Sequence, residues 1–428
     1  MGAVGTLVGT VTGTIVGTKP GEIALPAGFP WAPSWGIGGG PGRGYRPGLD
    51  PTTRRATTSA TRWIATTGND ANTGLVEGAP KRSLWSALIA AGATPTTFMI
   101  QAGTYDWDYS WAGQTQAADF NLIGYGGRVR ISTQPTGLSW SSVGSGAYST
   151  TFATAPYGVV DETHVDAYGV GTWLTQQASV VAVQASGGWY WTATTLTVKT
   201  FDGRAPDASL WAFPSSASKW SMRINGAAVT SCVENIDFVG GYRAEINAVG
   251  QFTAIDTTFS YSEFHAFHGV ACTEAQLWRC RAIGAKGAGG GADGFGYQAG
   301  WAKCLEVDCE GLSNGWDGSD ICNGSTSHGG VVIRCGGRYL HNQGPNVADV
   351  ASGKSITLGA VIGASRGVSS SQSTNVAGDG ATGEIWLADC YLDGAGTQDL
   401  YTLNAGSTIY TRATGYDVAG GVGTVGTW

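Results

Sequence analysis

Short strand-like segments recur through the C-terminal half of the chain and restrict its fold more than any other feature. Consecutive segments lie about 19, 23, 29 and 26 residues apart, and a gap of about 55 residues, close to two repeats, precedes the last one. Repeats of about 20–30 residues that contain strands are typical of a solenoid, in which each turn buries its inner face against its neighbours. The sequence therefore predicts a stack of β-coils. The segments are 233–238, 252–257, 275–280, 304–309, 331–335 and 384–390.

Half of the eight cysteines end such a segment, namely Cys280, Cys309, Cys335 and Cys390. Stacked turns lie about 4.8 Å apart, but side chains that are aligned in parallel do not point at one another as a disulfide requires. We therefore expect these four thiols to be reduced and to form a ladder in the interior of the stack. A disulfide among the remaining four is left open. These are Cys232, Cys272, Cys304 and Cys322.

The composition agrees with an all-β chain and excludes some functions. Glycine fills 69 of 428 positions, tryptophan 17, and charged residues make up only 13%. A net charge of -7 is wrong for a protein that coats phosphates, so no nucleic-acid partner is expected. No apolar run is long enough to cross a membrane, so we expect no membrane insertion. The first residues lack a signal peptide, and any export would depend on another route.

The first 60 residues differ from the rest. Gly-Thr pairs recur every four residues from Gly5 to Thr18, and residues 20–51 are rich in proline, glycine and tryptophan. A flexible tail is one interpretation. The other is an extended arm that becomes ordered against a partner, since Phe29, Trp31 and Trp35 are costly to leave in water.

Residues 62–106 predict a strand, a short helix and a second strand. Residues 62–70 read as a strand that runs into a turn, and Ser83 is placed to cap a helix over residues 83–91. The helix is followed by a strand over residues 98–101. Further on, residues 188–199 predict a hairpin, which belongs either to an inserted β module or to a simple flap.

Acidic, histidine and aromatic residues recur at the predicted turns. Asp293 precedes Asp317 by 24 positions, which places the two at comparable positions in successive coils, and the two histidines of residues 264–269 fall one coil earlier. Paired carboxylates can cleave glycosidic bonds. Alternatively, a carboxylate cluster can hold Ca²⁺ against a uronate while a base such as His328, Arg334 or Arg338 removes a proton. The structural alternative is that the Asp-Gly and Asn-Gly pairs only form turns.

The predicted site has two groups of residues and no protein-bound metal. The candidate catalytic residues are Asp293, Asp317, Asp320 and His328. The candidate substrate-binding residues are Tyr297, Trp316, Arg338 and Asp349. No cofactor is expected, with Ca²⁺ as the one ion that the carboxylates could hold.

The segments 314–318, 323–328 and 344–350 resemble right-handed parallel β-helix proteins of the pectate-lyase-like type found in phage virion appendages, tailspikes above all. The strand–helix–strand pattern at 62–106 resembles the capped N-terminal end of the same proteins. The resemblance implies an all-β fold: a right-handed parallel β-helix, or solenoid, with an N-terminal capping helix and an extended Gly/Pro-rich N-terminal arm. It also implies a homotrimer that binds, and often cuts, polysaccharide.

These expectations combine into one domain plan and one function. Residues 1–60 form an arm that attaches to other virion proteins, 61–150 the start of the β-helix with its capping helix, 151–225 an inserted β module with early coils, and 226–428 the remaining coils. The expected function is a virion appendage, a tailspike or fibre, whose β-helix binds and possibly cleaves host-surface polysaccharide outside the cell after lysis. The alternatives are a free polysaccharide lyase or glycoside hydrolase, and a purely structural collar or head decoration.

Overall fold

The structure is a computed structural model, and it describes residues 23–106, 116–215, 219–226, 228–287, 291–298, 303–316, 321–367, 373–394 and 398–428. The predicted Gly-Thr repeat before residue 23 lies outside these residues. Among the residues described, no helix is long and apolar enough to cross a membrane.

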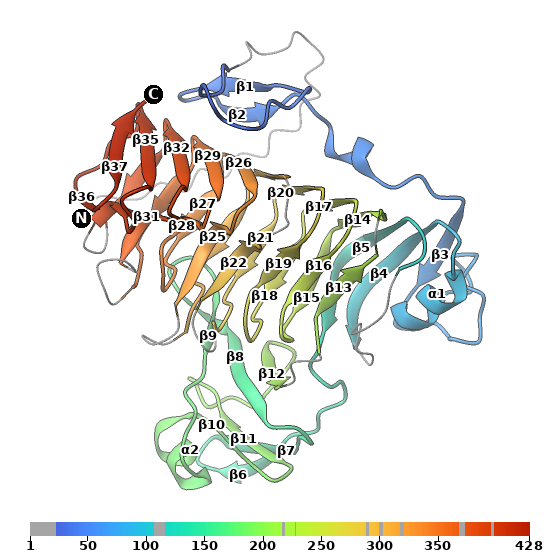
Figure 1. Cartoon of the computed structure of the whole chain (residues 1–428). Coiled ribbons are helices and arrows are strands. Elements are labelled where there is room, and N and C mark those ends of the chain that lie inside the picture. Colours follow the sequence, from blue (N-terminus) through green and yellow to red (C-terminus); the bar gives the residue numbers. More distant parts are fainter. Residues whose placement is uncertain are drawn as a thin grey trace.

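The chain winds into a right-handed parallel β-helix, which confirms the predicted fold class. Each coil contributes strands to three columns, and neighbouring coils pair in parallel register, for example β20 with β23 and β23 with β26. The coils stack from the α1 end to the β37 end (Figure 1). The gap of 55 residues between the last two predicted segments contains one further coil, as its length indicated.

The first column contains β3 (Ala60–Ile64), β4 (Thr96–Asp106), β5 (Phe120–Ser132), β14 (Thr230–Glu234), β17 (Gln251–Ile255), β20 (Glu274–Trp278), β23 (Lys303–Val307), β26 (Val331–Cys335), β29 (Lys354–Leu358), β32 (Glu384–Ala388), β35 (Thr408–Arg412) and β37 (Thr424–Thr427). The second column contains the end of β5, then β15 (Ile236–Val239), β18 (Thr258–Ser260), β21 (Arg281–Ile283), β24 (Glu310–Leu312), β27 (Arg338–Leu340), β30 (Val361–Gly363) and β33 (Tyr391–Asp393).

The third column is a separate sheet of nine strands. It contains β13 (Met222–Asn225), β16 (Ala244–Asn247), β19 (Phe267–Val270), β22 (Ala292–Tyr297), β25 (Cys322–Ser327), β28 (Val347–Val350), β31 (Thr374–Asp379), β34 (Gln398–Thr402) and β36 (Ala419–Gly421).

A single left-handed residue turns each coil from the first column into the second. Asn235, Asp256, Asp308 and Asp389 hold φ between 48° and 56° at this corner, and Gly336 holds 69°. Asparagine, aspartate and glycine accept this conformation most readily among the residue types. Most predicted segments therefore span a corner, and their last residues belong to the next column and not to the same strand. The segment 331–335 is the exception, because it ends before its corner at Gly336.

The corner corrects the predicted cysteine ladder. Cys280, Cys309 and Cys390 each follow the corner residue, face the interior and donate to backbone carbonyls, as predicted. Cys335, in contrast, ends β26, pairs with Val307 and packs on the outside. The ladder position in that coil is taken by Gly337, where a β-carbon would lie 2.4 Å from the Cys309 carbonyl oxygen. All eight cysteines are buried and none forms a disulfide, including the four whose pairing was left open.

The capping helix is confirmed. Helix α1 (Leu84–Ala91) begins at the N-cap Ser83, whose hydroxyl accepts from the Ser86 amide. Leu84 and Ala87 of this helix join the interior core that runs through the coils. The helix thus covers the apolar end of the stack, which a first coil would otherwise expose to water.

Two segments of the chain cover two of the three outer faces (Figure 1). The first is the arm, which contains the hairpin β1 (Ile37–Gly40) and β2 (Gly44–Pro47) and a 3-10 helix over Pro51–Arg54. Its Trp31, Ile37 and Tyr45 pack on the outside of the first column, and Phe29 meets Trp386 edge to face. The partner that orders this part of the arm is therefore the chain's own β-helix.

The second segment is the inserted module, which leaves the coil after β5 and returns at β13. Its β8 and β12 pack through Tyr157, Trp211 and Phe213 on the outside of the second column. The predicted hairpin at 188–199 is confirmed as β10 paired with β11. The elements are β6 (Ser141–Gly144), β7 (Ala147–Thr151), β8 (Pro156–Val165), β9 (Gly171–Trp173), α2 (Val180–Ser186), β10 (Gly188–Thr192), β11 (Thr195–Lys199) and β12 (Leu210–Pro214).

Candidate functional site

The outer face of the third column, which we call the open face, belongs to neither the arm's core cluster nor the insert's. Its outward residues alternate with inward ones, and parallel register places Arg223, Glu245, His268 and Thr326 on successive or nearby strands. Polar side chains from several described strands therefore lie together on the open face.

Asp293 is the centre of a compact polar cluster on this face. One carboxylate oxygen, Oδ1, accepts from Asn323 Nδ2 at 3.0 Å and from Thr326 Oγ1 at 2.5 Å. The other, Oδ2, lies 3.2 Å from His328 Nε2 and 3.3 Å from His265 Nδ1. The Asp293 side chain is only 1% exposed, whereas that of His328 is 22% exposed. His328 is thus the member of the cluster that meets solvent.

The two histidines around Asp293 play different parts. The backbone N–H of Asp293 donates to His265 Nδ1 at 3.0 Å, which requires an unprotonated Nδ1 and assigns the proton of a neutral ring to Nε2. Burial lowers the pKa of His265, in agreement with a neutral ring. His265 therefore has no proton to give to Oδ2, and His328 is the ring that donates to this carboxylate.

Charge and burial set the protonation of His328 and Asp293 together. Burial opposes the charged form of His328, but its hydrogen bond to Asp293 and the negative charge of that carboxylate outweigh burial and raise its pKa. Burial likewise opposes ionisation of Asp293, yet the hydrogen bonds around the carboxylate lower its pKa. The geometry therefore supports a carboxylate at Asp293 that holds a protonated, partly exposed imidazole.

A second carboxylate on the same face holds the next histidine. Glu245 Oε1 lies 2.9 Å from Arg223 Nε, and Oε2 contacts Arg243 and lies 3.3 Å from His268 Nδ1. Burial lowers the pKa of His268 to about 4 despite the Glu245 hydrogen bond. The His268 ring stacks on His265 with ring centres 4.4 Å apart. Both rings are neutral near pH 7, which removes the repulsion that two stacked cations would feel.

A pocket of about 300 Å³ opens beside His328. Two titratable groups besides His328 line it, Asp379 and Tyr401, together with Asn323 and several apolar side chains. Burial raises the pKa of Asp379. A carboxyl group and an imidazole whose pKa values are both raised can act as acid and base when they line the same pocket. The apolar lining residues are Ile321, Pro345, Ala348, Val350, Ala377 and Leu403.

The structure brings together Asp293 and His328 of the eight predicted site residues. Asp317 and Asp320 lie outside the described residues. The register pairs Asp293 with Asn323, and this strand pairing, not the spacing to Asp317, defines its position in the coil. The predicted position of residues 264–269 is correct, since β19 pairs with β22.

The other four predicted residues lie elsewhere. Tyr297 and Asp349 are fully buried in the coil interior, because their positions in β22 and β28 point inward. Arg334, a candidate base, is also fully buried. Trp316 lies beside Trp173 of the inserted module with ring centres 6.4 Å apart. Arg338 lies on the second column and pairs with Glu310 at 3.3 Å.

Sequence reasoning missed Glu245, Asn323 and Asp379 as members of the site. No local motif marks them. Only the strand register connects them to the histidines. The register can be derived from the sequence only when the positions of the coil corners are known. The spaced pair His265 and His268 was the local signal that existed.

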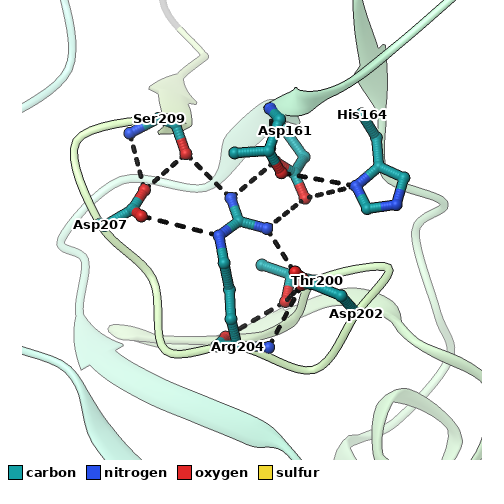
Figure 2. Close-up of polar contacts among 8 residues, drawn as sticks. Asp161, His164, Thr200, Asp202, Arg204, Asp207 and Ser209 are labelled. Atoms are coloured by element: carbon teal, nitrogen blue, oxygen red, sulfur yellow. Dashed lines mark hydrogen bonds and ion pairs between the residues drawn. The ribbon is translucent and has the colours of Figure 1, made fainter.

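Two further polar clusters lie away from the open face. In the inserted module, Arg204 lies between three aspartates (Figure 2). It donates to Asp161 through Nη1 at 2.9 Å and Nη2 at 2.7 Å, and this pairing lowers the pKa of the buried Asp161 against the effect of burial. His164 lies 3.6 Å from the same carboxylate. Because the buried carboxylate is fully used by its neighbours, the cluster fixes the 200–209 turn to β8.

The other cluster joins the inserted module to the coil. Ser313 contacts Asp166, and His341 Nδ1 lies 3.0 Å from Ser313 Oγ and 3.3 Å from Asp166. Serine and histidine here share one carboxylate in a closed triangle, so the histidine does not stand between serine and aspartate as in a nucleophilic triad. We interpret this cluster as a clamp between the two parts.

A pocket of about 700 Å³ lies at the α1 end. Its Asp70 accepts from the amides of Arg82 and Ser83, and its Asp106 accepts from Thr136. The Asp70 bonds hold the start of the capping helix, and the Asp106 bond joins the end of β4 to the segment after β5. Among the described residues, no group of three or more histidine, cysteine, aspartate or glutamate side chains has the arrangement of a metal site.

Comparisons with known proteins bear on the fold. No protein-family model and no curated protein matches the chain. A solved structure described as "Glycoside hydrolase" has a TM-score of 0.55 and 10% identity, covering 86% of this chain and 96% of that one. The fold is shared. At this identity the likeness supports the parallel β-helix and nothing finer.

Two other solved structures are less similar. Pectate lyase Pel9A has a TM-score of 0.49 and 12% identity, covering 87% of this chain and 80% of its own. The tailspike protein gp49 from Pseudomonas phage LKA1 has a TM-score of 0.28 and 14% identity, covering 79% and 76%. Both scores lie below 0.5, and we infer nothing from them.

Proposed function

We propose that this chain binds a polysaccharide along its open face and cleaves it at the pocket beside His328. One observation carries the proposal: the face that the described parts of the arm and the insert leave uncovered carries a partly exposed histidine, held by a buried carboxylate, next to a second titratable group. A long face of parallel strands suits an extended polymer, since both repeat in one direction. In hydrolysis, one of His328 and Asp379 would give a proton to the glycosidic oxygen of the departing sugar, and the other would accept a proton from the attacking water. In elimination, the base would instead accept the proton next to a uronate carboxyl group.

The test measures polymer length. Purified full-length chain is incubated with a panel of neutral and acidic surface polysaccharides, and chain length is followed by size-exclusion chromatography. We expect one polymer to shorten, and His328→Gln to slow the shortening by about 100-fold or more, as for loss of a general acid–base group. Products with an unsaturated end, detected by ultraviolet absorbance, identify elimination, and a new reducing end alone identifies hydrolysis.

The matched control is His164→Gln. His164 is 44% exposed on the inserted module, so the same substitution there should leave the rate unchanged. Equal rates for the two variants would contradict a role of His328. A polymer that binds without being shortened would contradict cleavage and leave a binding appendage. A polymer that neither binds nor shortens would favour the purely structural alternative.

We further propose that the chain works as a virion appendage, a spike or fibre that is attached through its N-terminal residues and assembles as a homotrimer. The resemblance of its segments to tailspikes supports this role. The attachment must avoid Trp31, Ile37 and Tyr45, which pack on the chain's own coil. A free lyase or hydrolase would use the same open face, so the site does not separate the two roles.

Attachment is tested by deleting residues 2–22, which leaves the packed part of the arm intact. We expect particles to assemble without the appendage. Full incorporation of the shortened chain would contradict attachment through this segment. Light scattering on the purified full chain should give three times the monomer mass, and a monomer would contradict the trimer.

A further inference from the structure

The interior of the β-helix changes from apolar to polar in the middle of the stack. In the first column, Glu306, Arg334 and Thr357 occupy one inward position on β23, β26 and β29. The same position holds Leu277 in the coil before and Leu387 in the coil after. All three polar side chains are fully buried. Such groups require partners inside the coil, because water outside cannot reach them.

Half of this polar interior is fully paired. Glu306 accepts from Tyr297 at 2.9 Å and from Ser325 at 2.6 Å through Oε1, and from Tyr339 at 2.6 Å through Oε2. Arg334 Nε donates to Ser325 Oγ at 2.9 Å and lies 3.5 Å from Glu306. The carboxylate of Glu306 and one nitrogen of the guanidinium are thereby satisfied.

The other half is unpaired. Arg334 Nη1 and Nη2, both carboxylate oxygens of Asp349, and the hydroxyls of Ser355 and Thr357 have no hydrogen-bond partner of ordinary length among the described residues. All four side chains are fully buried. Six such atoms in adjacent strands depart from the rule that buried polar groups are paired.

The register gathers these atoms in one place. Arg334 lies opposite Thr357 across β26 and β29, and Ser355 is two residues before Thr357 on the same inward side. Asp349 lies on β28 across the coil, where its negative charge acts on Arg334 and where Ser355 interacts with its carboxylate through both the backbone N–H and the hydroxyl. We call these four residues the Arg334–Asp349 cluster.

The mixture of donors and acceptors selects the ligand. A cation would meet the guanidinium, and an anion would meet the carboxylates of Asp349 and Glu306. An apolar molecule would leave all six atoms unpaired. Water both donates and accepts, and typically makes about three hydrogen bonds when it is buried among polar groups. We infer that the coil encloses water molecules that bridge Arg334 to Asp349, Ser355 and Thr357.

This internal water site is independent of the proposed cleavage. It lies on the inner side of β28, whose outer residues Ala348 and Val350 line the His328 pocket. Asp349 and the pocket thus share a strand but face opposite ways. The site would exist whether or not the open face binds a polymer.

A crystal structure of the full chain, at a resolution that shows ordered water and grown with bromide in place of chloride, tests the inference. We expect water density within hydrogen-bond distance of both an Arg334 Nη atom and an Asp349 oxygen, without an anomalous bromide peak. A bromide peak in the cluster would show that an anion, and not water, occupies it, which would overturn the inference. A direct Arg334–Asp349 contact with no density between them would overturn the site.

A solution measurement supports the crystal test. Relaxation dispersion of the water ¹⁷O signal counts water molecules that stay inside a protein for long times, and Asp349→Val should lower that count. The control is Asp399→Val, because Asp399 is a buried carboxylate of the same sheet that accepts from Asn375 at 2.8 Å and from the Asp417 amide at 2.7 Å. An unchanged count in Asp349→Val would contradict the inference. If that variant does not fold, the crystal structure decides.

Discussion

Two histidines lie against the same carboxylate of Asp293 but carry different charges. His265 accepts a backbone N–H and stays neutral, whereas His328 donates to Oδ2 and is stabilised as a cation. The difference arises from the direction of one backbone bond and from exposure, not from residue type. At the residue scale, the site therefore depends on which of the two rings Asp293 stabilises in its protonated form.

Asp293→Asn should lower the pKa of His328. The substitution keeps the shape of the side chain but removes the negative charge that outweighs burial, so the imidazole cation loses its main support. We expect a fall of about one unit or more, measured by NMR titration of the His328 ring. Asp207→Asn, on the inserted module, is the control. An unchanged His328 titration in Asp293→Asn would contradict the assigned ion pair.

The contribution of His268 to stability should fall as the pH drops from about 6.5 to about 4, against the opposite contribution of Asp349, whose pKa burial raises to about 7. The folded chain lowers the pKa of His268 to about 4, whereas an unfolded histidine titrates near 6.5, so the unfolded state binds more protons in this window. His265 acts in the same direction. His328, whose pKa is raised, acts oppositely: its contribution is complete below about 6.5 and is lost as the pH rises through its folded pKa.

Urea unfolding of wild type and His268→Gln at about pH 7 and about pH 4.5 checks this expectation. Glutamine can still donate to Glu245 but does not titrate, so the variant should lose less stability on acidification. His164→Gln should behave as wild type. The same loss in His268→Gln as in wild type would show that His268 does not cause the acid sensitivity.

At the scale of elements, much of the coil was predictable and its orientation was not. Short apolar segments at regular spacing predicted the stack, and Ser83 before an apolar run predicted the capping helix. The corner residues were not recognised, because Asn235, Asp256 and Asp308 resemble ordinary turn residues. Without the corners, inward and outward positions cannot be told apart, and for this reason Tyr297 and Asp349 were predicted to bind a ligand outside the coil.

The cysteines show the same limit. Cys280, Cys309 and Cys390 follow a corner, whereas Cys335 precedes one, although all four end a short apolar segment. Cys335 lies two residues before the ladder position, which keeps the alternation along the strand but places the cysteine before the corner. Its side chain therefore points out of the coil, toward the arm. Residue spacing alone could not detect this, since coil lengths vary.

The arm is the element whose docking is most easily tested. Its hairpin β1–β2 forms its own sheet and, among the described strands, pairs with none of the coil, so side chains carry the attachment: apolar ones and ion pairs such as Arg46 with Asp308. Trp31 is 6% exposed. Trp31→Ala should cost about 3–5 kcal/mol of docking free energy, comparable to other buried aromatic truncations.

Hydrogen exchange measured by mass spectrometry locates the effect of Trp31→Ala. We expect faster exchange over residues 23–49 and unchanged protection in the coil strands β20 to β32. Trp191→Ala, on the inserted module, should leave exchange in the arm unchanged. Loss of protection throughout the coil would show that the arm is part of the folding unit and not a docked element.

At the scale of the whole molecule, no disulfide bond contributes to stability. All eight cysteines are free and buried, and burial raises the pKa of Cys232, Cys272 and Cys335 to about 12. A buried thiol with a raised pKa reacts slowly. We expect no thiol to react with an aromatic disulfide reagent in the native state and all eight to react in denaturant.

The melting temperature should be the same with and without a reducing agent. A melting temperature that falls on reduction would contradict the free thiols. Comparison with the denatured chain, which exposes every cysteine, serves as the control for reagent access.

The parallel register of the third column gives the open face a fixed pitch. One strand follows another about every 4.8 Å along the coil axis, so equivalent outward positions form a one-dimensional lattice. A polymer whose own repeat is commensurate with that lattice keeps its repeating units in phase with successive strands. A polymer with an incommensurate repeat drifts out of phase within a few strands. A face of this kind therefore selects a polymer by the length of its repeat as well as by its chemical groups.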